Sequence, residues 1–201
     1  MVYAAQEVLQ DIGGIARFAY IQSDECSIVL NDALDLNTQP WFDNNIQKIC
    51  SVSASVFTLS FNLFAPFAGG INTDGPAYFD SRLFMVPDEQ EMINCMIWRQ
   101  QDATRNSVEQ YGRSMYSHTE MMNKNNAQVQ DMMMAKGFNW NDAPTWTKRG
   151  VVVTKEKIDW EIPIFTQDKD YLSKLYRPIE ETQKDMTEVE EVAAQGSGKT
   201  E

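Results

Sequence analysis

The sequence predicts an α+β fold in which helices pack against an antiparallel sheet. Two strand-like runs, 15–22 and 25–31, are separated by a short polar turn, as in an antiparallel hairpin. A helical pattern precedes the hairpin, and a long one at 41–63 separates it from a third strand-like run at 77–86. This order matches a β-α-β-β-α-β sandwich that lacks its first strand, so we expect the helices on one face of the sheet.

The first helices follow from apolar periodicity and from residues that end helices. Residues 1–12 predict a short helix, which two consecutive glycines end. Along 41–63, apolar residues recur at spacings of three and four and define one buried face, with Asn37-Thr38 as the expected cap. A loop rich in glycine, proline and asparagine, 66–76, leads into the third strand.

The second half of the chain is predicted to be mainly helical. A long helix covers 88–115, and its first residue is an aspartate with a glutamate three positions on, as in a capping box. A shorter helix spans 126–136 and stops at a glycine. Two short strand-like runs are expected at 151–153 and 162–165.

The charge of the chain limits the kinds of partner it can bind. Its 201 residues carry a formal net charge of −12, which argues against binding through a broad positive surface. Residues 178–201 hold seven acids and two lysines, and we expect this tail to be disordered. Any contact with nucleic acid must therefore use local clusters of cations.

Cysteine usage and apolar patterning predict a cytoplasmic protein. The three cysteines are an odd number without metal-ligand spacing, which is typical of reduced thiols. No run of about 18 uncharged apolar residues occurs, so we expect no membrane span. The single histidine, His118, lies in an expected loop without a nucleophile motif and is interpreted as a surface residue.

Two adjacent acids, Asp24 and Glu25, stand at the hairpin turn. Side chains alternate along a strand, so the two should point to opposite faces, and only one of them can face a given site. Such acids are either solvated turn residues or ligands for a positive group. Two cations have the same two interpretations, as ordinary structural residues or as residues that bind a ligand. In the structural interpretation Lys48 is an exposed helix lysine, and Arg82 is a partner of Asp80 on one strand face.

Six segments, in this order, resemble motifs of the tRNA-histidine guanylyltransferase family, and in particular its bacterial and phage-type like proteins. They are Gln22–Leu30, Pro76–Phe84, Trp98–Ser107, Asn123–Asn125, Gly137–Asp142 and Lys148–Gly150. The resemblance implies a ferredoxin-like polymerase-palm domain over 1–155, an extension over 156–177 and the tail beyond it. It also implies 3′-to-5′ addition of nucleotides to the 5′ end of tRNA, as guanylyl transfer or as template-dependent repair.

The resemblance implies that the hairpin acids are catalytic. Asp24 would bind metal in a site for two Mg²⁺ ions, with Glu25 as the supporting acid, and GTP, ATP and other triphosphates would be substrates.

Further residues of the motifs are implied to bind nucleotide or RNA. Ser23, Lys48 and Arg82 would bind the nucleotide, because cations hold phosphates. A channel for RNA or triphosphate would be lined by Asp102, Asn106, Lys124, Lys148 and Arg149. Arg99 is expected to pair internally with an acid such as Asp102, its neighbour one helical turn away.

The chain also departs from the family pattern. Residues 1–14 contain no counterpart of the family's first palm strand, which carries a metal-binding aspartate, so we expect an incomplete metal site. Thr104 stands where eukaryotic members carry a histidine, which favours repair-type addition.

The expected partners are tRNA, nucleotides and further copies of the chain, since family members form tetramers. Two other functions stay open, a palm-type nucleotide cyclase and a non-catalytic RNA-binding or assembly module whose missing strand comes from a partner.

Overall fold

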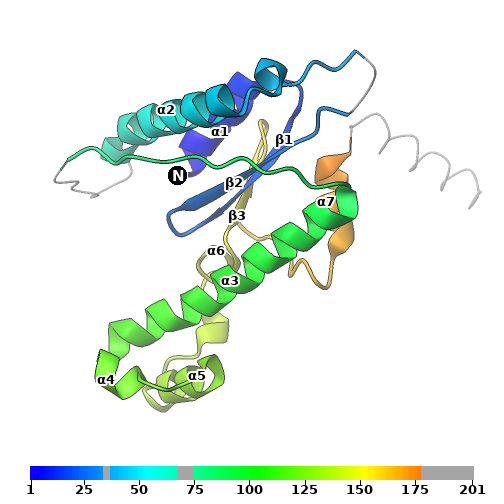
Figure 1. Cartoon of the computed structure of the whole chain (residues 1–201). Helices are drawn as coiled ribbons and strands as arrows, with labels where there is room; N and C mark the ends of the chain where they lie inside the picture. Colours follow the sequence, from blue (N-terminus) through cyan, green and yellow to red (C-terminus); the bar gives the residue numbers. More distant parts are fainter. Residues whose placement is uncertain (34–36, 68–74, 178–201) are drawn as a thin grey trace, which may run out of the picture.

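The structure is a computed structural model that describes residues 1–33, 37–67 and 75–177. These residues form one antiparallel sheet of four strands in the order β2-β1-β3-β4, which confirms the expected α+β class (Figure 1). The strands are β1 (Ala16–Gln22), β2 (Glu25–Leu30), β3 (Val151–Val153) and β4 (Ile158–Asp159). The α-helices are α1 (Val2–Ile12), α2 (Ile46–Phe64), α3 (Glu89–Met115), α4 (His118–Met121), α5 (Asn126–Ala135), α6 (Thr145–Arg149) and α7 (Lys169–Tyr176). Three short 3₁₀ helices among the described residues are η1 (Trp41–Asn44), η2 (Ala65–Phe67) and η3 (Trp140–Asp142).

The predicted hairpin is present, with β1 and β2 joined by a turn of two residues. Gln22 pairs with Glu25 in the ladder, so Ser23 and Asp24 form the turn. On its other side β1 pairs with β3, far along the chain. The central strand β1 is therefore held by both a local and a long-range partner.

Helices cover both faces of this sheet. We expected the helices on one face, and α1 and α2 do share a face, over an apolar cluster that includes Ala19, Ile21 and Val153. The opposite face, which carries Phe18 and Tyr20, packs against α3 and α7 (Figure 1). Because nearly every residue of β1 is buried, both faces of the strand need cover, and a single helical layer does not suffice.

The C-terminal half of α3 extends beyond the sheet and carries a helical arm. In Figure 1, α4 and α5 pack at the far end of α3, away from the strands. The arm has a small apolar core of its own, formed by Val108, Val129 and Met133. Its helix ends agree with the sequence, because Asn125 caps α5 in a capping box with Gln128.

Residues 77–86 are extended but are not a strand, so the prediction of a third strand there was wrong. Side chains of α2 bind this backbone instead: Asn62 binds both the N–H and the carbonyl of Ala77, at 2.8 and 2.9 Å, and Thr58 accepts from the N–H of Phe79 at 3.1 Å. The ring of Phe79 packs against Phe57 of α2, with centroids 4.8 Å apart. No ladder partner for 77–86 lies among the described residues, and a strand needs one.

The last predicted strand was also placed wrongly. β4 lies at 158–159, whereas 162–165 is irregular and is held by the side chain of Gln100. That glutamine is buried and binds the carbonyl of Pro163 at 2.9 Å and the N–H of Phe165 at 2.8 Å. A side chain thus satisfies backbone groups that a neighbouring strand would otherwise bind.

Two helix starts differ from their predicted positions, and one is confirmed. The cap of α2 is Asn45, not Asn37-Thr38, since its side chain accepts from the N–H of Lys48 at 3.1 Å. The segment before it, η1, has left-handed backbone angles and cannot continue the helix. His118 begins α4 rather than lying in a loop, and it is exposed as expected. Asp88 caps α3 as predicted, at 2.9 Å from the N–H of Glu91.

Two findings concern the expectation of a cytoplasmic protein without a membrane span. They are the state of the cysteines and the apolar character of α2. The three cysteines are unpaired and partly buried. By length and composition alone, Ile46–Phe67 would be able to span a membrane, which the criterion of uncharged runs did not reveal. In the structure α2 packs one face on α1 and buries Ile49 and Phe57. The predicted acidic tail, 178–201, lies outside the described residues.

Candidate functional site

The hairpin turn presents one unengaged carboxylate. Ser23 and Asp24 are both exposed, and Ser23 has a φ of 49°, in the left-handed region. The carboxylate of Asp24 forms no hydrogen bond or ion pair with any described residue. Since the turn follows directly from the paired residues Gln22 and Glu25, the ladder fixes the place of this acid.

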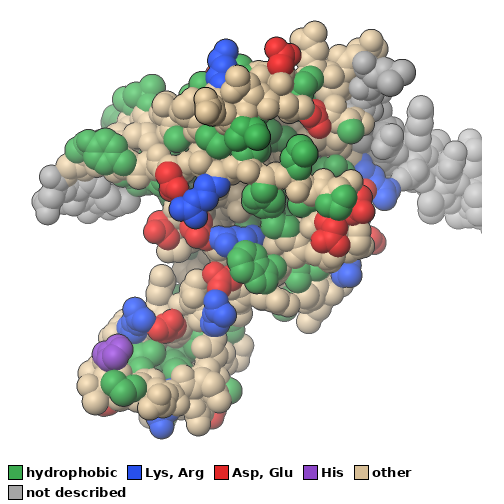
Figure 2. Space-filling model, viewed as in Figure 1, with side chains coloured by type: hydrophobic (Ala, Val, Ile, Leu, Met, Phe, Trp, Pro, Cys, Tyr) green, Lys and Arg blue, Asp and Glu red, His purple; other side chains and the backbone are tan. Residues whose placement is uncertain are grey.

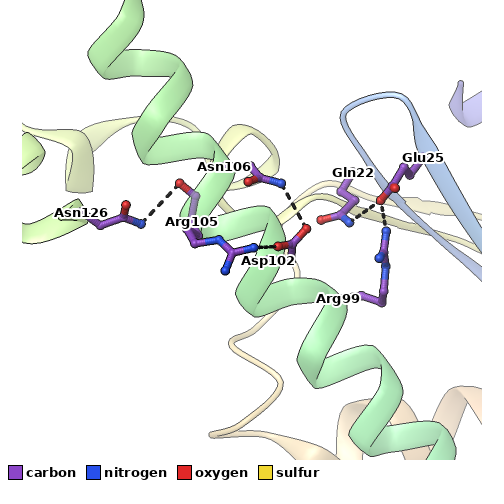
Figure 3. Close-up of polar contacts among 7 residues, drawn as sticks. All are labelled: Gln22, Glu25, Arg99, Asp102, Arg105, Asn106 and Asn126. Carbon is purple, nitrogen blue, oxygen red and sulfur yellow. Dashed lines mark hydrogen bonds and ion pairs between the residues drawn. The ribbon is translucent and has the colours of Figure 1, made fainter. Parts of the chain in front are cut away.

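Glu25 is bound within the protein. It accepts from Nε2 of Gln22 at 2.9 Å and forms an ion pair with Arg99 of α3 (Figure 3). The Arg99 side chain is only 18% exposed. Arg99 therefore pairs internally with an acid, as expected, but the acid is Glu25 and not Asp102: the guanidinium crosses to the hairpin and joins it to α3.

Asp102 belongs to a second polar group, one turn further along α3. It pairs with Arg105 and accepts from Nδ2 of Asn106 at 3.1 Å. The carbonyl of Arg105 accepts in turn from Asn126 at the start of α5, at 3.4 Å (Figure 3). Polar side chains thus follow α3 from the hairpin turn to the helical arm.

Two buried polar atoms at the hairpin end of this row have no partner among the described residues. They are Oε1 of Gln22 and Nε of Arg99. Buried polar atoms are normally hydrogen-bonded, and unpaired ones concentrate where function or bound water needs them. The junction of hairpin and α3 therefore keeps one acceptor and one donor unused.

Charged side chains and a buried tyrosine lie next to this junction of the hairpin and α3. Figure 2 shows acidic and basic side chains gathering on the face where the hairpin tip meets α3. Behind them, burial raises the pKa of Tyr20, with the charges of Arg99 and Asp102 as smaller influences. The neutral Tyr20 hydroxyl donates to the carbonyl of Arg149 at 2.5 Å.

Three predicted phosphate- or RNA-binding cations are exposed and do not bind the turn. Lys48 lies in the first turn of α2, and its Nζ is 4.4 Å from the ring centroid of Phe42. Arg82 pairs with Asp80 at 3.0 Å, which is the partner considered from the sequence, although the segment is not a strand. Lys124 lies between α4 and α5 on the arm.

The other two predicted channel cations, Lys148 and Arg149, bind backbone carbonyls of the protein. Lys148 is buried, and its Nζ donates to the carbonyl of Asn141. Arg149 donates to the carbonyl of Ile162 at 3.2 Å. Both cations thus bind backbone carbonyls next to α6, Lys148 as a buried side chain and Arg149 as a half-buried one.

The donor set at the turn fits a magnesium–triphosphate complex only in part. Among the described residues no group of three or more histidine, cysteine or acidic side chains could hold a metal ion. Mg²⁺ usually takes one or two carboxylates and completes its shell with water and phosphate oxygens. Asp24 suits that role, whereas Glu25 is already neutralised by Arg99. The described residues thus supply one carboxylate ligand, which is less than the expected site for two ions needs.

The sequence did not indicate some members of this cluster. Gln22 continues an apolar strand and Arg105 is one of many helix cations, so neither stands out in the chain. The available signals were their positions, directly before the turn and one turn after Asp102, and their membership of the motif segments Gln22–Leu30 and Trp98–Ser107.

Comparisons with known proteins agree with this fold and these motifs. The family model for tRNAHis guanylyltransferase matches residues 1–87. A bacterial tRNA(His) guanylyltransferase-like protein, solved in complex with ATP, is 37% identical with a TM-score of 0.80, over 87% of this chain and 77% of that chain. Another such structure, in complex with GTP, is 36% identical with a TM-score of 0.68, over 86% of this chain and 74% of that chain.

Among curated proteins, the probable tRNA(His) guanylyltransferase of Dictyostelium discoideum is 26% identical over 77% of this chain and 63% of its own length. The chain spans between 55% and 63% of the length of the curated relatives it matches. Because the bacterial structure in complex with ATP is 37% identical to this chain, which covers 77% of it, the chain belongs to the tRNA(His) guanylyltransferase family.

Proposed function

We propose that this protein adds nucleotides in the 3′-to-5′ direction to the 5′ end of tRNA, using nucleoside triphosphates. The observation that carries the proposal is Asp24, an unengaged carboxylate at a turn whose neighbour Glu25 is fixed by Arg99. Relatives solved with ATP and with GTP support triphosphates as substrates. Repair-type addition is favoured because Thr104 occupies the position of the eukaryotic histidine.

Asp24 would hold the magnesium–triphosphate complex. When bound, the ion neutralises phosphate charge and orients the reacting oxygens. The role of Asp24 is to fix the triphosphate at the turn, and that of Glu25 is to keep Arg99 against the hairpin. A second ion would need ligands in addition to these two acids.

Exposed cations would complete the binding of phosphate. The pair between Arg82 and Asp80 is almost fully exposed and so is worth about 0–1 kcal/mol. Arg82 can therefore exchange Asp80 for a triphosphate at little cost, and the exposed Lys48 is equally free to turn from Phe42. Both would act as nucleotide-binding residues together with Ser23.

The tRNA would lie along α3 toward the arm. Asp102 and Asn106 line this path, and Lys124 is an exposed cation on the arm. In a chain with net charge −12, such local cations must carry the phosphate contacts. The proposal also includes the assembly of several copies of this chain, as in other members of the family.

Incorporation of labelled nucleotide into a 5′-truncated tRNA, with Mg²⁺ and the four triphosphates, tests the proposal. We expect Asp24→Asn to lower incorporation at least about 100-fold, because an amide is a poor magnesium ligand. Asp11→Asn is the matched control, since Asp11 is an exposed acid at the end of α1. Equal incorporation by the two variants would overturn the role of Asp24. If ATP alone gave cyclic AMP and pyrophosphate without tRNA, a cyclase would be indicated instead.

A binding module without transfer is the second candidate. It is favoured by one observation, the lack of a three-ligand metal group among the described residues. Binding of tRNA or MgGTP by the wild-type protein without any incorporation would establish this candidate and exclude the first.

A further inference from the structure

An exposed tryptophan lies on α3 directly before Arg99. Trp98 is 60% exposed. Its neighbours one turn away, Asn94 and Gln101, are exposed and polar. The indole therefore projects from a part of α3 whose exposed neighbours one turn away are polar.

The indole is coupled to the hairpin turn through Arg99. The guanidinium carbon of Arg99 lies 5.2 Å from the Trp98 ring centroid, within the range of a cation–π interaction. The same guanidinium pairs with Glu25, the residue after Asp24. One side chain thus joins the ring to the turn that carries the proposed metal ligand.

These surroundings distinguish between the possible partners of the ring. A protein partner would bury an apolar patch with few charged residues, whereas the exposed helix neighbours of Trp98 are polar and the guanidinium of Arg99 lies against its ring. A nucleobase instead needs one flat aromatic ring on which to stack.

We propose that Trp98 is a positioning residue whose indole stacks on a nucleobase of the substrate. This inference rests on the proposed function and assigns a nucleobase contact at that same site. The base is that of the incoming triphosphate or the first unpaired base at the tRNA 5′ end. Stacking there would hold the nucleotide beside Asp24, and it would tolerate any base, since every base has a π-face.

Fluorescence titrations of the full chain test the stacking. MgGTP, MgATP and a 5′-truncated tRNA are titrated separately against the wild type, Trp98→Phe and Trp98→Ala. Trp146→Phe and Trp146→Ala are the matched controls, because Trp146 is 51% exposed but packs edge-on against Trp160. Because the loss of one indole changes the signal, affinities of all variants are also measured by calorimetry.

We expect Trp98→Ala to bind one of the probes roughly 5- to 150-fold more weakly, and Trp98→Phe to keep most of the affinity. The quenching seen with the wild type should persist in both Trp146 variants and vanish in both Trp98 variants. Weakening with the triphosphates assigns the ring to the incoming nucleotide, and weakening with tRNA alone assigns it to the RNA base.

Incorporation assays separate this inference from the proposed function. If the wild type incorporates nucleotide and Trp98→Ala retains its affinities and its KM, the stacking role is overturned while the function stands. If the wild type neither binds the probes nor incorporates nucleotide, the proposed function fails and the stacking role fails with it.

Discussion

Glu25, the first residue of β2, forms an ion pair with Arg99 in α3, and this pair joins the hairpin turn to the helix on one face of the sheet. Arg99 is mostly shielded from water, whereas Glu25 is about half exposed. The pair is thus intermediate between a surface ion pair and a buried one.

Removal of the Glu25 charge should destabilise the fold. Glu25→Gln leaves a shielded guanidinium without its counterion, and we expect a loss of about 1–2 kcal/mol in the free energy of unfolding. Urea denaturation measures this loss in the free energy of unfolding. The exposed pair of Glu109 and Arg113 supplies the control, since Glu109→Gln should cost only about 0.3–0.5 kcal/mol. Equal losses in the two variants would show that the shielding of Arg99 contributes nothing.

Gln100 should be one of the most sensitive polar residues of the fold. Gln100→Ala leaves the carbonyl of Pro163 and the N–H of Phe165 without their partner, and we expect a loss of about 2–4 kcal/mol. Gln101→Ala, at the next and exposed position, should stay within about 0.5 kcal/mol of the wild type. Chemical denaturation of both variants decides whether the glutamine holds 162–165 against α3.

Two glycines with similar backbone angles should respond differently to alanine. Gly150 has a φ of 84°, and a Cβ there would lie 2.4 Å from the carbonyl oxygen of Ile21. Gly137 has a φ of 83° and open space around it. We expect about 1 kcal/mol for Gly137→Ala, from the backbone alone, and at least about 3 kcal/mol for Gly150→Ala. Similar melting temperatures for the two variants would contradict the close approach of α6 to β1.

The stability should fall at alkaline pH through Cys26. Burial raises the pKa of this thiol to about 12. Between pH of about 9 and 12 the unfolded thiol has lost its proton while the folded one keeps it, so stability is full below the lower value and is lost as pH rises. The slope for one thiol is at most about 1.4 kcal/mol per pH unit.

Cys26→Ala should flatten this alkaline loss. The measurement is the midpoint of urea unfolding from pH 8 to pH 11, for the wild type and the variant. Tyr20 contributes in the same direction, because burial also raises its pKa, and that part remains in Cys26→Ala. An unchanged slope in the variant would assign the effect to the other groups whose pKa burial raises, which are Tyr20, Tyr171, Tyr176 and Cys95.

Local patterns made much of the fold predictable. The hairpin, the cap at Asp88 and the end of α5 depend on residues within a few positions of one another. The periodicity that predicted α2 is equally local, but its predicted buried face was wrong in part, since Ile46, Leu59 and Leu63 are exposed. Hydrogen bonds inside one element and the alternation of its faces can be read from the chain, because their partners are at fixed sequence distances.

The candidate site was predictable only as a set of motifs. The sequence located Asp24 and Glu25 at a turn, but it suggested an acid such as Asp102 as the partner of Arg99, whereas in the structure that partner is Glu25. Lys148 looked like a free cation beside Arg149 and is instead buried against the carbonyl of Asn141. A short sequence spacing allows a contact and does not select it when a distant partner lies closer in space.

What the sequence by itself determined is therefore the hairpin, most of the helices, the turn acids and the family. What only the tertiary structure decided is which acid stays available, which cations are engaged, and that helices cover both faces of the sheet. It also decided that 77–86 remains an extended segment bound by side chains of α2. The physical reason is that desolvation and pairing depend on segments brought together by packing, and no local pattern of the chain encodes those distances.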